Sequence, residues 1–85
     1  MAFDQHEARR IIQAAEEYMR QHQPPGYLPT SEENKAFQEL RTRRSVANFR
    51  EDMDALREAN TALVVRALES YAGHNAELEE PGPTT

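Results

Sequence analysis

The chain contains no cysteine and no tryptophan. Without cysteine it can form neither disulfide bonds nor thiolate metal sites, which is typical of proteins from reducing compartments. Its first seven residues have neither the basic nor the apolar region of a secretory signal. We therefore expect a cytoplasmic protein.

Long apolar runs are also missing. The longest covers residues 62–65, whereas a membrane-spanning helix needs about 20 apolar residues. Only 38% of the 85 residues are hydrophobic, so the chain can build no more than a thin core. Domains of this size are often marginally stable alone, and association with a second chain is a common remedy.

Positive charge is not in excess. The net charge is −5, and the segment 73–85 carries three glutamates and no basic residue. A protein that binds nucleic acid mainly by neutralising phosphates is usually basic, so this balance argues against that class.

Nine arginines accompany one lysine. We attribute this bias mainly to a GC-rich bacterial or phage genome rather than to a need for bidentate contacts.

Glycine and proline are absent from residues 31–72. This segment is rich in alanine, leucine, arginine and glutamate, which are good helix formers. One continuous helix of that length would span about 60 Å, too long for the rest of the chain to cover. The segment follows residues 23–30, which contain three prolines. They form either a rigid turn between helices, which we favour, or an exposed polyproline-type ligand.

A first helix is predicted over residues 5–22. Asp4 is a good N-cap and Glu7 stands three residues further on, which is the pattern of a capping box. Apolar residues then recur at steps of four and three from Ala8 to Met19, which indicates an amphipathic helix. The prolines that follow must end it.

A second helical segment begins after Thr30, which forms another capping-box pattern with Glu33. From Val46 onward, apolar residues recur at steps of three and four, as in a heptad repeat. The apolar residues upstream lie on a shifted stripe, so the phase of the pattern slips near Ser45.

Two folds fit this slip. We favour one continuous helix over residues 31–72, which makes the chain an all-α helical hairpin. In the alternative, the helix breaks near Ser45, and Asn48 with Glu51 forms the capping box of a third helix. That break makes a three-helix bundle.

The hairpin predicts a homodimer that forms a helical bundle. A helix over residues 5–22 cannot cover one over residues 31–72, and soluble monomers seldom leave such an apolar stripe bare. Asn60 lies in this stripe, where it either fixes the register of the partner helices or reaches solvent at the edge. The predicted dimer interface consists of Phe49, Met53, Leu56, Asn60, Leu63, Val64, Ala67, Leu68 and Tyr71.

The end of the chain differs in composition from its body. Gly73 is placed to end the helix as a C′ glycine. Two prolines and three glutamates follow it. We predict one helical domain over residues 1–73 and an acidic, flexible tail over residues 74–85.

No constellation of residues indicates catalysis. The three histidines lack the spacing of metal-binding motifs, the glycines are isolated, and no serine has a histidine placed to activate it. Adjacent carboxylates such as Glu16 and Glu17 point about 100° apart on a helix and so do not form a dyad. We predict no enzymatic activity, no metal and no cofactor.

The arginines are the best remaining candidates for a functional surface. The densest cluster lies at the phase slip, and a further arginine follows seven residues after one of its members. These side chains form either a solvated flank with i, i+4 partners or a docking surface for an acidic partner. Together with a tyrosine of the proline-rich turn, the predicted partner-binding residues are Arg41, Arg43, Arg44, Arg50 and Tyr27.

These features favour a small non-enzymatic protein-binding module, such as an adaptor, regulator or inhibitor of a larger protein. The alternative is a nucleic-acid-binding regulator that uses the basic patch over residues 41–50. A third hypothesis is a subunit that completes the active site of an enzyme in trans. Two amphipathic helices and a rigid turn offer a shaped surface on a chain too small to house a deep pocket.

Overall fold

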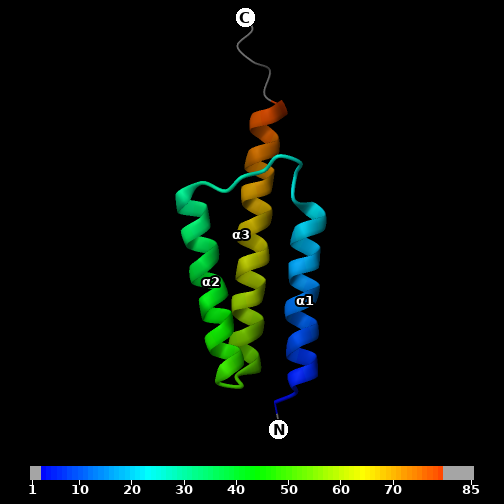
Figure 1. Cartoon of the computed structure of the whole chain (residues 1–85), viewed down its shortest axis with the longest axis vertical. Coiled ribbons are helices and arrows are strands. Elements are labelled where there is room, and N and C mark those ends of the chain that lie inside the picture. The colour runs from blue at the N-terminus through cyan, green and yellow to red at the C-terminus, as the bar shows by residue number, and fades with distance from the viewer. Residues whose placement is uncertain (1–2, 80–85) are drawn as a thin grey trace, which may run out of the picture.

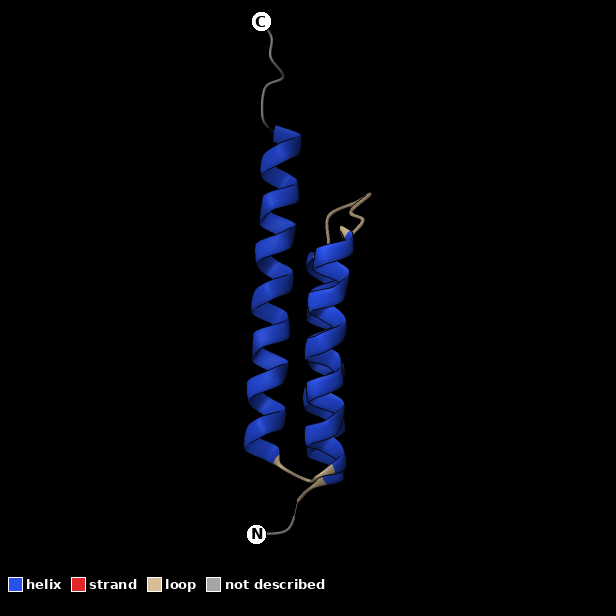
Figure 2. Cartoon of the chain, turned by 90° about the vertical axis from the view of Figure 1, so that its left-hand side faces the viewer, coloured by secondary structure: helices blue, strands red, loops and turns tan. Residues whose placement is uncertain are grey.

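The computed structural model describes residues 3–79 and is all-helical over that range. It contains α1 (Gln5–His22), α2 (Ser31–Phe49) and α3 (Met53–Glu79). Figure 1 shows α3 between α1 and α2, and Figure 2 shows α1 and α2 on the same side of it. Helix α3 packs against both of the others, whereas the backbones of α1 and α2 hardly approach each other.

Helix α1 forms where it is predicted. The Asp4 carboxylate accepts hydrogen bonds from the backbone N–H groups of His6 (2.9 Å) and Glu7 (3.2 Å), which confirms its role as N-cap. The reciprocal hydrogen bond of the predicted capping box, from the Asp4 N–H to the Glu7 side chain, does not form, so this part of the prediction is wrong. The Glu7 side chain instead pairs with Arg57 of α3, at 2.8 Å, so its partner comes from tertiary packing and not from its own helix.

Helix α2 begins with the predicted capping box. The Thr30 N–H donates to the Glu33 carboxylate at 2.8 Å, and the Glu33 N–H donates to the Thr30 hydroxyl at 3.1 Å. Both bonds satisfy backbone donors that the first helical turn would otherwise leave unpaired. The connector before Thr30 is a turn, and Gly26 in it has a φ of 77°, which glycine adopts without steric cost.

The continuous helix predicted over residues 31–72 is wrong. Helix α2 ends at Phe49, and α3 begins at Met53. The alternative is right in its number of helices, although the break lies beyond Ser45, at residues 50–52. The expected capping box of Asn48 and Glu51 does not form.

The break has the hydrogen bonds of a Schellman motif. The Glu51 N–H donates to the Asn48 carbonyl (3.1 Å), and the Asp52 N–H donates to the Ala47 carbonyl (3.0 Å). Asp52 then caps α3, because its carboxylate accepts from the Ala55 N–H at 3.1 Å. The chain therefore stops one helix and starts the next within three residues and without glycine or proline.

Glu51 occupies the position of this motif that usually belongs to glycine. Its φ is 57°, in the left-handed region that a Cβ atom disfavours. We expect Glu51→Gly to raise the free energy of unfolding by up to about 1 kcal/mol, because glycine adopts this conformation without strain. Part of this gain is offset, because glycine also increases the conformational entropy of the unfolded chain. Urea denaturation measures the change.

Glu51→Ala is the control for this substitution, since it removes the same charge and keeps the Cβ atom. We expect it to show none of the gain. A glycine variant no more stable than the alanine variant would mean that residue 51 is not strained.

The core lies between α3 and the other two helices. One cluster of buried side chains includes Met19, Phe37 and Leu63, and a second includes Ala8 and Leu56. Leu56 and Leu63 are fully buried, with no exposed area. The α3 part of the predicted heptad stripe is thus the centre of the core.

This arrangement changes the argument for a homodimer. The predicted interface residues on α3 are buried or half-buried within one chain, and Phe49 alone among the predicted set is widely exposed. The apolar stripe that was expected to be bare is covered by α1 and α2. The homodimer itself stays a prediction, and it now needs a different surface.

Helix α3 does not stop where the sequence predicts. It continues through Gly73 to Glu79, and Figure 1 shows its last turns extending past the ends of α1 and α2. A helical glycine costs about 1 kcal/mol, which is not enough to end a long helix. The first residues of the predicted tail are therefore helical, and residues 80–85 lie outside the described residues. The division into a domain over 1–73 and a tail over 74–85 stays a prediction.

No helix within residues 3–79 combines the length and apolar character needed to cross a membrane.

Candidate functional site

Two of the predicted partner-binding arginines are paired with a carboxylate of α1. Arg41 donates two hydrogen bonds to the Glu16 carboxylate of α1, at 3.0 and 3.2 Å. Arg44 donates to the same carboxylate at 2.7 Å, and its side chain is only 9% exposed. The Glu16 carboxylate thus binds two guanidinium groups and links α1 to α2 through side chains, since the backbones of these two helices hardly approach each other. Arg41 and Arg44 therefore already have an ion-pair partner within the chain.

Asn60 completes this network from α3. Its side-chain oxygen accepts from Arg44 at 3.0 Å, and its NH₂ group donates to the Ile11 carbonyl at 3.3 Å. Asn60 is buried, so it does not reach solvent at the edge of the stripe. The buried amide is hydrogen-bonded on both sides, which removes most of the cost of burying it. The network ties all three helices together.

The network also shifts the titration of its carboxylate. Burial raises the pKa of Glu16, but the hydrogen bonds and positive charges of Arg41 and Arg44 together outweigh burial. The pKa of Glu16 therefore lies below its ordinary value, and the carboxylate is ionised at neutral pH. This geometry fits a structural role for Glu16, because its charge is already matched.

The outer face of α2 is different in character. Phe49 is 89% exposed and Val46 is 42% exposed. They lie in an open groove of about 640 Å³. The groove is lined by Gln38, Arg41, Thr42, Ser45, Val46, Phe49 and Arg50.

Local sequence explains why these side chains face outward. Phe37, Arg44 and Ala47 form the buried face of α2. Val46 and Phe49 lie on the other side of the helix, since neighbouring positions are about 100° apart. The heptad pattern placed both residues in one stripe with those of α3, but the break at residues 50–52 separates them from it.

Two predicted arginines remain on the surface. Arg43 and Arg50 are exposed, and no ion pair involves either of them within residues 3–79. Arg50 lines the groove, and Arg43 lies seven residues before it, on the same side of α2. The structure therefore divides the predicted basic patch into a pair held by Glu16, Arg41 and Arg44, and an exposed pair, of which Arg50 lines the groove and Arg43 does not.

Tyr27 is not on this surface. It is buried, and its ring packs edge-on against Tyr71 (5.0 Å between ring centroids) and His74 (5.5 Å). The exposed side chain of the connector is Leu28, at 82%. We therefore leave Tyr27 out of the docking surface.

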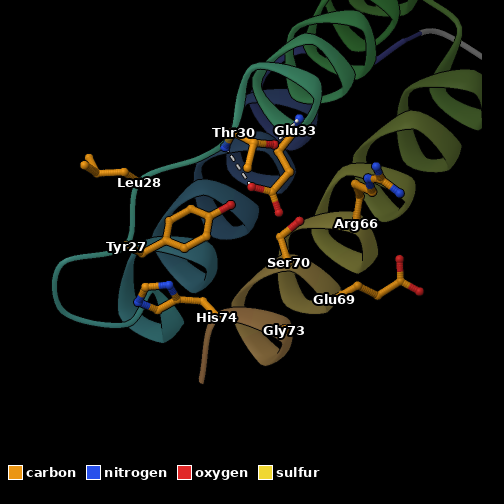
Figure 3. A pocket seen from close by; sticks show the side chains of 9 residues that line it. All are labelled: Tyr27, Leu28, Thr30, Glu33, Arg66, Glu69, Ser70, Gly73 and His74. Atoms are coloured by element: carbon orange, nitrogen blue, oxygen red, sulfur yellow. Dashed lines mark hydrogen bonds between the residues drawn. The ribbon is translucent and has the colours of Figure 1, made fainter. Parts of the chain in front are cut away.

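A small polar cavity of about 330 Å³ lies beside Tyr27, between the connector and α3. Figure 3 shows the Tyr27 hydroxyl directed toward Glu33 and Ser70. This hydroxyl has no hydrogen-bond partner among the described residues, and burial raises its pKa. The hydrogen bond from the Thr30 backbone lowers the pKa of Glu33, which keeps that carboxylate ionised as a helix cap.

The cavity also brings together a serine and a histidine, a pair that the sequence interpretation missed. Ser70 and His74 are four residues apart on α3 and both line the cavity. Their i, i+4 spacing was the signal that could have found them. No hydrogen bond joins them in the part of the chain that the structure describes, so the geometry of an activated nucleophile is not present.

Among the described residues, no group of three or more His, Asp or Glu side chains lies close enough together to hold a metal ion.

No family model matches the chain, and no curated protein or solved structure is significantly similar to it.

Proposed function

We propose that this protein is a small non-enzymatic protein-binding module, an adaptor, regulator or inhibitor, that docks a larger protein on the outer face of α2. The observation that carries the proposal is Phe49, an aromatic side chain with 89% of its area exposed. Large aromatic side chains that are surrounded by a groove and flanked by arginine are typical anchors of protein interfaces.

The alternative, a nucleic-acid-binding regulator, fits the structure less well. It relies on the arginines of residues 41–50, and Glu16 pairs with two of these and cancels one of their two positive charges. Arg43 and Arg50 alone, on a chain with a net charge of −5, would release few counterions from a phosphate backbone. A cytoplasmic location and a homodimer remain part of the proposal, with the exposed side chains of α2 as the surface for any second copy.

Phe49→Ser tests this function. Because Phe49 contributes little to the core, we expect the free energy of unfolding to change by less than about 0.5 kcal/mol. Binding to the partner should weaken by at least about 2 kcal/mol, roughly 30-fold in Kd. The tagged protein is used as bait in nuclease-treated lysate of the source cells, and the captured protein is then purified for calorimetry.

Leu28→Ser is the matched control, because Leu28 is 82% exposed and belongs to the connector between α1 and α2. Figure 1 shows this connector at the opposite end of the bundle from the last turn of α2, which ends at Phe49. We expect it to capture the partner as well as the original chain does. The proposal is wrong if Phe49→Ser and Leu28→Ser capture the same proteins. It is also wrong if a parallel capture from untreated lysate yields nucleic acid and no protein is retained after nuclease treatment.

A further inference from the structure

The outer face of α2 carries a stripe of residues whose spacing is the same in both directions. Gln38, Thr42, Ser45 and Phe49 recur at steps of four, three and four, so they lie along one side of the helix. All four are exposed, and none is charged. A two-fold axis between Thr42 and Ser45 therefore places this stripe against its own copy, with the two helices antiparallel.

The middle of the stripe allows two helices to pack closely. Thr42 and Ser45 are small, and the two-fold axis places Thr42 of one chain opposite Ser45 of the other. The helix axes can then approach to the 8–10 Å that is usual for packed helices. Phe49 lies about 8 Å along the helix from the two-fold axis, and Gln38 lies equally far on the other side. Each Phe49 thus lies beside Gln38 of the other chain.

A cleft lies next to Gln38. Figure 2 shows α1 and α2 on the same side of α3, and their backbones hardly approach each other. They leave between them a cleft of about 510 Å³, with an apolar lining from Ile12, Met19 and Tyr71. Arg41 lines both this cleft and the groove on α2, so the cleft and the groove are adjacent.

The spacing of the stripe brings Phe49 of a second copy to this cleft. Gln38 lies one turn before Arg41, toward the connector, and Met19 lies in the last turn of α1, which leads into the connector. Within one chain, Phe49 ends α2 at the opposite end of the bundle from the connector. A contact between Phe49 and Met19 can therefore form only between two chains.

The charges of the cleft are already paired. Its four charged residues form two ion pairs, Glu16 with Arg41 and Glu17 with Arg20. Arg44 also binds Glu16, but it is buried and does not line the cleft. An uncharged occupant fits such a cleft better than a charged one, and the stripe of a second copy is uncharged.

The charged residues of α2 lie beside the stripe and not in it. Glu39, Arg43 and Arg50 are exposed on one flank. Antiparallel packing places Glu39 of one chain about 3 Å along the axis from Arg50 of the other, and it places the two copies of Arg43 at the same level. Attraction and repulsion are both present on this flank, so we expect the contact to depend little on salt.

From these observations we propose that a second copy of this chain packs antiparallel against α2 and places its Phe49 in the cleft between α1 and α2. The contact is isologous, so it forms twice and closes a dimer. The inference rests on the proposed function in one respect. A larger protein that docks on Phe49 has to displace the second copy, so dimerisation controls access to this face.

Analytical ultracentrifugation of the full chain tests the dimer. We expect a monomer–dimer equilibrium, and Phe49→Ser should raise its Kd at least about 30-fold, because Phe49 is the anchor of both copies of the contact. Leu28→Ser is the control and should leave the Kd unchanged, since Leu28 is equally apolar and exposed but lines neither the groove nor the cleft. A tenfold increase in salt should change the Kd less than about threefold.

Disulfide cross-linking tests the register. The chain contains no cysteine, so introduced cysteines react without background. Chains carrying Thr42→Cys and chains carrying Ser45→Cys are oxidised separately and as a mixture. We expect the mixture to cross-link fastest, because the two-fold axis places Thr42 opposite Ser45, whereas a parallel dimer would cross-link each variant fastest to itself.

NMR tests the place of Phe49 in the cleft. A mixture of ¹³C-labelled and unlabelled chains is used for isotope-filtered NOE spectra, which report only contacts between chains. We expect NOEs from the Phe49 ring to the methyl groups of Met19 and Ile12.

Several results would overturn the inference. A chain that stays monomeric at the millimolar concentration used for NMR forms no such dimer. A dimer that survives Phe49→Ser, or that shows no NOE between Phe49 and the cleft, has its interface elsewhere.

The inference and the proposed function fail in different ways. If the chain is monomeric while Phe49→Ser loses a protein captured from lysate, the proposed function stands and this inference fails. If the dimer forms as described while Phe49→Ser and Leu28→Ser capture the same proteins, the dimer stands and the proposed function fails.

Discussion

Replacing Leu63 by alanine is expected to remove a large part of the protein's free energy of unfolding. Leu63 has no exposed area and packs in one cluster with Met19, Phe37 and Tyr71. Truncating a buried leucine to alanine costs about 2–5 kcal/mol, because apolar contacts are lost and a cavity remains. Small domains have about 5 kcal/mol of stability at the lower end of the usual range, so this one change removes much of it.

Val65→Ala is the matched control, two residues away on the same helix. Val65 is 50% exposed, and we expect its truncation to change the free energy of unfolding by less than about 0.5 kcal/mol. Urea denaturation followed by circular dichroism measures both. Similar losses for Leu63→Ala and Val65→Ala would mean that α3 is not oriented in the bundle as the structure has it.

The same experiment addresses the homodimer. If the protein is a monomer with Leu63 in its core, the urea midpoint of the original protein should not depend on protein concentration. If the α3 stripe is instead buried between two chains, dilution should lower the midpoint, because dissociation is then part of unfolding. A dependence over a hundredfold range of concentration that Phe49→Ser leaves unchanged would favour the interface predicted from the sequence. A dependence that Phe49→Ser removes would favour a dimer formed through the outer face of α2.

Signals close together in the chain were sufficient for part of the fold. Asp4 and the prolines after His22 define α1, and Thr30 with Glu33 defines the start of α2. Each depends on hydrogen bonds or backbone restrictions within a few residues, so a linear pattern contains them. The three-helix alternative followed from the slip of the apolar stripe near Ser45.

The position of the break was not readable from the sequence. Residue 51 takes the left-handed conformation that usually calls for glycine, yet it is glutamate. Helix propensity favours no interruption there. Burial of Leu56 and Leu63 against α1 and α2 stabilises the turned-back chain, and this tertiary effect outweighs local propensity.

The candidate site shows the same limit. The sequence showed where the arginines are concentrated along the chain. It did not indicate that Arg44 lies against Glu16, a residue 28 positions away. The exposure of Phe49 depends on the break after it, so the heptad pattern assigned it to a dimer interface. Asn60 had two equal interpretations, and only its contacts with Arg44 and Ile11 decide between them.

Glu16→Gln is expected to have the second largest effect on stability. The substitution keeps the shape of the side chain and removes the charge that balances Arg41 and Arg44. Breaking a buried ion pair costs about 3–5 kcal/mol. Because the Glu16 side chain is 38% exposed, we expect a smaller loss of about 2–3 kcal/mol, in the range of hydrogen bonds to charged groups.

Glu17→Gln is the control, since Glu17 is adjacent and also pairs with an arginine. Its partner Arg20 is 73% exposed, and an ion pair open to solvent contributes little to stability. The two variants remove the same charge from the same helix and differ in the burial of the arginine left behind. Equal losses of stability would show that burial of Arg44 does not matter.

The loss caused by Glu16→Gln should depend on pH in a defined direction. The pKa of Glu16 in the folded protein lies below the ordinary value of 4.5. Its carboxylate therefore stabilises the fold fully above that value, and the contribution disappears as the pH falls through the lower, folded pKa. We expect the difference between the original chain and Glu16→Gln to be large at pH 7 and smaller at pH 3, measured by urea denaturation at both. A difference that stays constant would mean that the carboxylate charge does not hold the two arginines.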